Sequence, residues 1–233
     1  MPITLNQLSY RAIYKLIGAG LLSVAATAQA AVSFVNLGTS APPSTLGAYS
    51  MQAFSTVPQA AIANGTSVTT LPGSPIPGSL TLDTALTKHT VPGGGWSTWS
   101  HGYTGPVYGM YTNGGPRILT LPPSTGAFYV YVEPNSFGSF NVQATTDTGA
   151  SSGPISVSGS AGATGFGFHA GPGESIVSVT ITADPGANGF AIGEFGIASS
   201  ALPVPVPTLS EGGMAALVVM MLAGSMAAMR RRS

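Results

Sequence analysis

Both tryptophans of the chain lie in one aromatic stretch that could bind a sugar. The stretch reads GGGWSTWSHGY over residues 93–103 and continues to Tyr108 and Tyr111. Flat aromatic rings with polar edges can stack on sugar faces where they are exposed. The candidate glycan contacts are therefore Trp96, Trp99, His101 and Tyr103. The alternative is that one face of this stretch belongs to the core, where aromatic side chains usually lie.

Two short motifs match catalytic or cofactor-binding signatures without the context these signatures need. Residues 149–153 fit G-x-S-x-G, but a nucleophile elbow needs a strand before it and a helix after it, and this stretch is a Gly/Ser loop. Residues 165–170 fit the dinucleotide pattern, yet Phe166 and Phe168 are expected in a strand and no helix follows. We therefore expect no catalytic residue and no cofactor.

The titratable residues show no metal-binding pattern. The histidines, His89, His101 and His169, lie far apart, whereas zinc sites usually combine closely spaced ligands. Asp184 and Glu194 are the nearest candidate pair for calcium, but no D-x-D-x-D-G loop accompanies them. We expect no metal. A glycan hydrolase with paired carboxylates stays open, because two such residues meet only in the fold.

Charge and cysteine content narrow the class of protein further. Residues 31–205 hold two cations, Lys88 and Arg117, against six carboxylates, which leaves a net charge of −4. Such a surface gives phosphates nothing to bind, so we expect no nucleic-acid partner. The chain has no cysteine, so neither disulfides nor thiolate metal sites can stabilise it. Stability must come from a core and from backbone pairing.

The elements that would position these residues are short strands. Residues 31–201 are rich in Gly, Pro, Ser and Thr and have short, often alternating apolar segments. This pattern predicts one all-β domain, an antiparallel β-sandwich of jelly-roll-like type. The expected strands are residues 32–37, 49–57, 67–71, 79–82, 106–111, 117–121, 127–133, 138–144, 154–158, 165–169, 175–182 and 188–197.

Three of these strands carry specific predictions. Residues 127–133 have large side chains on both faces, which predicts a central strand. Residues 175–182 place Val177, Val179 and Ile181 on one face, which predicts one buried and one wet side. Residues 188–197 change their apolar register midway, and a bulge at Gly193-Glu194 would restore one apolar face.

The first thirty residues have the layout of a signal peptide. Arg11 and Lys15 precede an eleven-residue apolar stretch, residues 16–26, and Ala28 and Ala30 form a small-residue cleavage site. The mature protein is expected to begin near Ala31, and the apolar stretch is too short for a stable transmembrane helix.

The other end of the chain has the layout of a membrane stop. A Pro-rich spacer, residues 202–211, precedes an uncharged run at residues 212–229 that would be about 27 Å long as a helix, near the lower limit for a span. Residues 230–233 follow, with Arg230, Arg231 and Arg232 expected on the cytoplasmic side. The domain would then lie on the outer side of the inner membrane. One interpretation of the C-terminal segment is a membrane anchor that is not processed.

Two sets of residues resemble a known class. YVEPN at residues 131–135, FGSF at 137–140 and GFAIGEF at 189–195 resemble bacterial exported β-sandwich proteins with C-terminal sorting tails. The tail itself resembles the IPTL-CTERM signal, a relative of the PEP-CTERM tails, with Val206 in place of the usual Ile and Gly212 in place of Trp. The motif residues are Val206, Pro207, Thr208, Leu209 and Gly213, of which the last four match the usual pattern.

This resemblance implies an exported protein whose tail an exosortase-type membrane peptidase cuts. A membrane-anchored precursor would be released or transferred to the cell surface or the extracellular matrix, where exopolysaccharide is the implied partner. We thus expect a non-enzymatic surface protein. The alternative is a carbohydrate-binding module or weak glycan hydrolase that uses the aromatic region from Trp96 to Tyr111.

Overall fold

The computed structural model describes residues 32–112 and 115–200. The predicted signal peptide, sorting motif, transmembrane helix and arginine tail lie outside these described residues. Within them, no helix is long and apolar enough to cross a membrane. The domain is all-β, as predicted, with one antiparallel sheet of twelve strands and a small two-stranded sheet.

The strands follow one another with short connections. In chain order the elements are β1 (Ser33–Gly38), β2 (Thr45–Leu46), β3 (Tyr49–Ser50), β4 (Gln52–Ala53), α1 (Thr56–Ala60), β5 (Ser67–Leu71), β6 (Leu80–Val91), β7 (Gly105–Gly109), β8 (Arg117–Thr120), β9 (Thr125–Pro134), β10 (Ser139–Thr146), β11 (Ile155–Ser158), β12 (Thr164–His169), β13 (Ser178–Ala183), the 3-10 turn Pro185–Ala187, and β14 (Phe190–Ser199).

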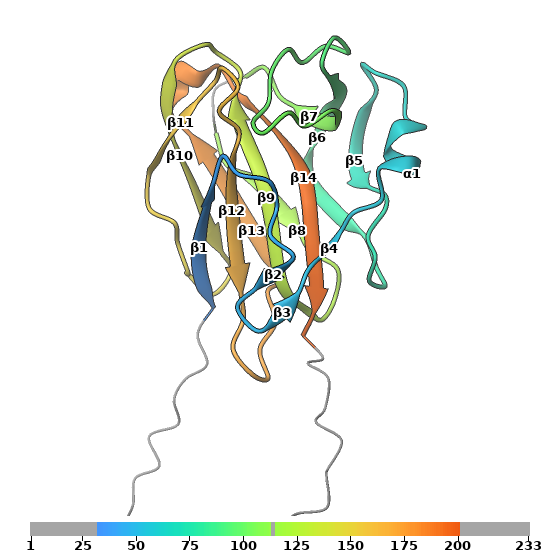
Figure 1. Cartoon of the computed structure of the whole chain (residues 1–233), viewed down its shortest axis with the longest axis vertical. Helices are drawn as coiled ribbons and strands as arrows, with labels where there is room; N and C mark the ends of the chain where they lie inside the picture. The colour runs from blue at the N-terminus through green and yellow to red at the C-terminus, as the bar shows by residue number, and fades with distance from the viewer. Residues whose placement is uncertain (1–31, 113–114, 201–233) are drawn as a thin grey trace, which may run out of the picture.

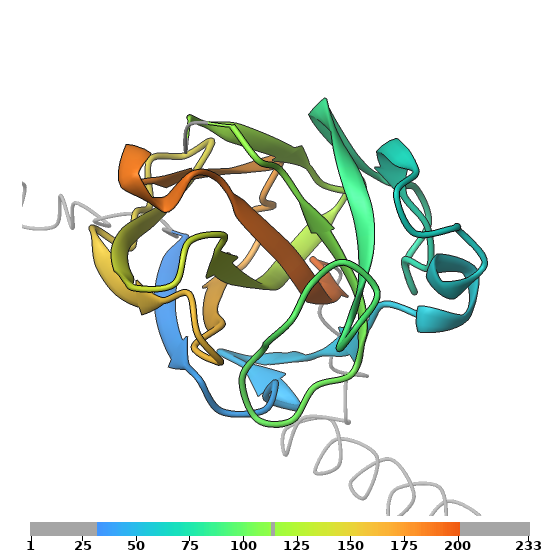
Figure 2. The same ribbon diagram turned by 90° about the horizontal axis from the view of Figure 1, so that it is seen from above.

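The large sheet curls around a single main core. Its strand order is β1-β12-β9-β14-β7-β6-β8-β13-β10-β11, with β4 added to β14 and β5 to β6. Figure 2 shows the strands curled around a common interior. Strands β9, β12 and β14 and strands β10 and β13 all contribute to this core. Side chains from both groups, including Phe128, Phe166, Val142 and Ile181, belong to the same buried cluster.

Strand β9 is central, as its sequence predicts. It pairs with β12 on one side and β14 on the other, and every residue in it is buried. Phe128, Val130 and Val132 face the main core, whereas Tyr129 and Tyr131 belong to a second buried cluster on the opposite face. The second face of β9 must therefore be covered, and residues 92–104 provide part of that cover.

The predicted bulge in β14 is confirmed. The pairing of β14 with β9 shifts between Gly193 and Gly196, and Glu194 has a left-handed backbone with φ +54°. Because of this extra residue, Phe195 and Ile197 reach the same core as Phe190 and Ile192. The bulge also leaves the Glu194 side chain beside the second cluster.

Several predicted strand limits are wrong, each for a local reason. Residues 49–57 form two very short strands and the start of α1, since Pro58 suits the first turn of a helix. Strand β6 continues past Leu82 to Val91, because its polar residues pair with β5, β7 and β8 on either side. Val177 precedes β13 and is 56% exposed, whereas Val179 and Ile181 are buried as predicted.

Glycines opposite Tyr129 and Tyr131 leave room for these rings on the face of β9 that points away from the main core. Tyr129 stands between Gly167 of β12 and Gly196 of β14, and Tyr131 stands between Gly165 and Gly193 in the same two strands. A Cβ on Gly196 would coincide with the Tyr129 ring, and a Cβ on Gly165 would lie 2.6 Å from Tyr131 Cζ. The rings therefore lie over neighbouring strands at positions without side chains.

Replacing one of these glycines should cost stability. We expect Gly196→Ala to lower the free energy of unfolding by about 1–3 kcal/mol, the usual cost of overpacking a buried site. Gly186→Ala is the matched control, because its Cβ would meet only the Phe140 ring at 3.3 Å, and it should change stability by less than about 0.5 kcal/mol. Urea unfolding measures both; equal stabilities for the two variants would contradict this packing.

Candidate functional site

Residues 92–104, which connect β6 to β7, form a loop without regular strands that we call the aromatic loop. It lies at the end of the sheet opposite the start of β1 and the end of β14 (Figure 1). Trp96 and Trp99 of this loop pack with Tyr129, Tyr131 and Val107 in the second buried cluster. The loop thus covers the face of β9 and β14 that points away from the main core.

Glu133 holds one end of the aromatic loop. Its carboxylate accepts a hydrogen bond from Trp96 Nε1 at 2.6 Å and another from Thr98 Oγ1 at 3.1 Å. The backbone N–H of Gly162 donates a third at 3.2 Å. Glu133 is 0% exposed, and a buried carboxylate needs such donors to replace water. Burial raises the pKa of Glu133, whereas its hydrogen bonds with Trp96, Gly162 and Thr98 oppose that rise.

Glu194 holds the other end of the loop in the same manner. Trp99 Nε1 donates to Glu194 Oε2 at 3.0 Å, and His101 Nε2 lies 2.9 Å from Oε1. Burial raises the pKa of Glu194, and the contacts with His101 and Trp99 oppose that rise. Each tryptophan of the chain is thus bonded through its indole N–H to one glutamate of the sheet.

Both partners of the His101–Glu194 contact have unusual backbones. The φ angle is +42° at His101 and +54° at Glu194, and left-handed conformations are uncommon for residues other than glycine. Ser100 Oγ and the carbonyl oxygen of Thr39 lie 2.9 and 3.1 Å from His101 Nδ1. Contacts at both ring nitrogens thus hold His101 in one orientation beside Glu194.

The structure brings the four candidate glycan contacts together but encloses the tryptophan rings. Trp96 and Trp99 are only 6% and 5% exposed, so neither offers an open face to a sugar. The loop is not a strand, and both indoles turn toward the sheet because their N–H groups bond the two glutamates. Tyr103 is partly buried and donates its hydroxyl to the Pro106 carbonyl at 3.0 Å.

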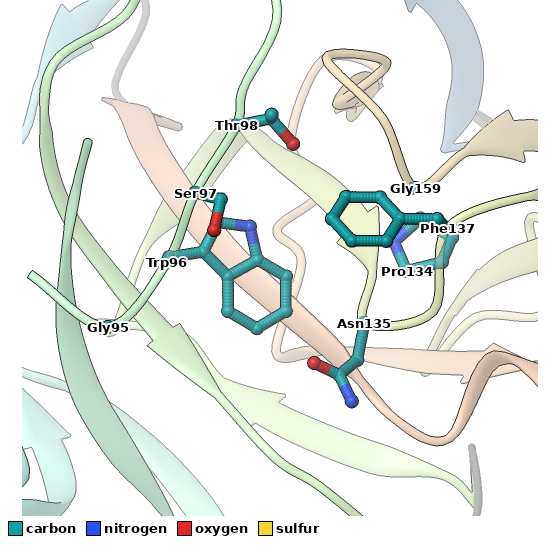
Figure 3. Close-up of a pocket in the computed structure, with 8 residues that line it drawn as sticks. All are labelled: Gly95, Trp96, Ser97, Thr98, Pro134, Asn135, Phe137 and Gly159. Atoms are coloured by element: carbon teal, nitrogen blue, oxygen red, sulfur yellow. The ribbon is translucent and has the colours of Figure 1, made fainter. Parts of the chain in front are cut away.

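Two pockets lie beside the aromatic loop. The first, of about 190 Å³, lies between Trp96 on one side and Pro134 and Phe137 on the other, with Asn135 at its edge (Figure 3). The second, of about 360 Å³, lies on the Glu194 side and is lined by Tyr103, Tyr129 and Phe195 among others. Only the second contains a carboxylate, and its Glu194 side chain is 12% exposed.

These contacts define the chemistry that the two glutamates can perform. Glu133 is closed to solvent and already accepts three hydrogen bonds, so it serves to hold the loop. Glu194 borders a pocket and retains acceptor capacity, because each of its oxygens has one identified partner. Residues 32–112 and 115–200 contain no group of three or more metal-ligating side chains, and Asp184 instead accepts from the Asn141 N–H at 2.9 Å.

The pairing of each glutamate with a tryptophan was not predicted from the sequence. A signal is visible in retrospect, since Glu133 ends the apolar run YVYVE and Glu194 interrupts the apolar run AIGEF. A carboxylate inside an apolar strand must find donors when it is buried, and indole N–H groups are donors only. The partners come from 37 and 95 residues away, so the fold was needed to identify them.

The fold and the site together define an all-β domain with an aromatic loop held by two carboxylates of the sheet. No protein family model, no curated protein and no solved structure matches the chain.

Because burial raises the pKa of Glu133, this residue should give the domain a distinct pH dependence. The stability that Glu133 contributes to the folded protein is complete below the ordinary carboxyl pKa of 4.5 and is lost as the pH rises through the raised pKa. We expect the unfolding free energy of the protein, relative to Glu133→Gln, to fall as the pH is raised from 4.5 to neutral and above. Urea unfolding of both proteins across this range measures it. A difference that stays constant or grows with pH would contradict the assignment.

Proposed function

We propose that the chain is a non-enzymatic exported protein of the cell surface or extracellular matrix, sorted through its C-terminal tail. In this proposal a signal peptide, residues 1–30, directs export, and residues 212–229 stop the precursor in the inner membrane. An exosortase-type peptidase then cuts near the motif that contains Pro207, Thr208 and Leu209. The domain leaves for the surface or the medium, with exopolysaccharide as the implied surrounding.

One observation on the described domain carries this proposal. The chain enters and leaves the domain at the same end, as the start of β1 and the end of β14 show in Figure 1. The pairing agrees, because Ser33 is opposite His169, His169 is opposite Ala127, and Ala127 is opposite Ala198 across four adjacent strands. A tether attached at this end leaves the aromatic loop facing away from the membrane.

The composition of the domain supports the same proposal. We take residues 31–201 to be one secreted unit, with the curled sheet forming a jelly-roll-like sandwich and residues 202–211 acting as a spacer. A domain without cysteine can be stable because three buried hydrophobic clusters and paired strands take the place of covalent links. Glu133 and Glu194 are engaged in holding the aromatic loop, which favours a structural use of these carboxylates over hydrolysis.

The mass of the protein from its native host tests the sorting proposal. We expect a chain that begins near Ala31 and ends close to Pro207, found on the surface or in the medium rather than in the inner membrane. Intact-mass measurement with C-terminal peptide mapping of envelope and medium fractions gives both ends. A chain that retains Arg230, Arg231 and Arg232 and occurs only in the inner membrane would contradict sorting and leave a tethered periplasmic domain.

A further inference from the structure

The pocket beside Glu194 combines apolar walls with a single charge. We call it the Glu194 pocket; its walls include Met51, Phe54, Tyr103, Tyr129 and Phe195, and its volume is about 360 Å³. Among the described residues that line it, Glu194 is the only charged one. Pro42 and Pro43 close one side, and Ala53 and Thr56, both exposed, stand at its rim. The pocket therefore offers a small ligand both apolar contact and one anion.

The charge of Glu194 has no permanent cation beside it. The described part of the chain contains one lysine and one arginine, and neither lines the pocket. Lys88 Nζ donates to Asn64 and Thr90, and Arg117 donates to the Pro116 carbonyl. Besides the Trp99 indole N–H, Glu194 contacts His101 Nε2, which lies 2.9 Å from Oε1, and His101 does not line the pocket. Among the residues that line the pocket, no second charged side chain offsets the charge of Glu194.

The aromatic side chains around this carboxylate remain uncharged. Burial, together with the Glu194 charge, raises the pKa of Tyr129 to about 12, and the same causes raise the pKa of Tyr103. Neutral phenol rings present an electron-rich face to a cation. The Tyr129 ring lies in the space that a side chain at Gly196 would occupy. The centroid of the Tyr103 ring lies 6.0 Å from that of Trp99. The walls are thus formed before any ligand arrives.

We propose that the Glu194 pocket binds a small organic cation, an alkylammonium ion with its carbon groups against the aromatic walls and its charge facing Glu194. An anion would be repelled by the carboxylate, and a calcium ion usually takes several carboxylate and carbonyl ligands, whereas Glu194 is the one carboxylate among the residues that line this pocket. A neutral ligand of the same shape would gain no charge attraction from the carboxylate. Aromatic walls with one carboxylate match the chemistry by which proteins select quaternary ammonium groups.

Choline is the probe that tests this proposal, with 3,3-dimethylbutan-1-ol as its uncharged analogue of equal shape. The protein is isolated from its host, and binding is followed by calorimetry and by tryptophan fluorescence, because Trp99 donates to Glu194. We expect saturable choline binding and an affinity for the neutral analogue that is at least about tenfold weaker. No saturation up to about 10 mM, or equal binding of the two compounds, would overturn the proposal.

Two variants at exposed positions test whether choline binds in this pocket, and neither changes a residue of the aromatic loop. Ala53→Arg places a cation of the chain's own at the rim, and Val57→Arg places the same side chain on α1 at an exposed position outside the pocket. We expect Ala53→Arg to weaken choline binding at least about tenfold and Val57→Arg to leave it unchanged. Glu194→Gln should also weaken binding at least about tenfold if it folds. Unaltered binding in a folded Ala53→Arg protein would exclude this pocket.

Discussion

The hydrogen bonds between two glutamates, one buried and one partly buried, and two indole N–H groups fix the aromatic loop on the sheet. Glu133 and Glu194 lie on adjacent strands, β9 and β14, and each bonds one tryptophan of residues 92–104. A buried carboxylate without donors would be strongly unfavourable, so each glutamate selects one position for its tryptophan. The second buried cluster and both pockets beside the loop depend on that placement.

The sheet leaves space for the aromatic side chains that lie beside these hydrogen bonds. Glycines flank Tyr129 and Tyr131 on both neighbouring strands, so the rings can lie close to the backbone and form a flat apolar layer. Trp99 continues this layer over Gly193, where a Cβ would lie 3.4 Å from its ring. The bulge at Glu194 then adds a carboxylate to that same face while Phe195 returns to the main core. Packing and polar bonding thus act at the same place.

The sequence predicts those parts of the fold in which side-chain alternation reflects burial. The central position of β9, the bulge at Gly193-Glu194 and the limits of β5 follow from apolar periodicity and are confirmed. Apolar periodicity does not predict the structure where backbone pairing or turn geometry determines it. Examples are the polar half of β6 and the segment from Tyr49 to Val57. It also fails for Trp96 and Trp99, since hydrogen-bond partners distant in sequence turn both rings inward.

The indole N–H protons give the most direct test of the central interaction. The chain has two tryptophans, so a ¹⁵N-labelled sample should show two indole N–H signals, assigned by Trp96→Phe and Trp99→Phe variants. If the carboxylates hold the loop, both protons exchange with solvent far more slowly than an exposed indole, and Glu133→Gln and Glu194→Gln each shift only the signal of their own partner. Rapid exchange of both signals in the folded protein would contradict the account.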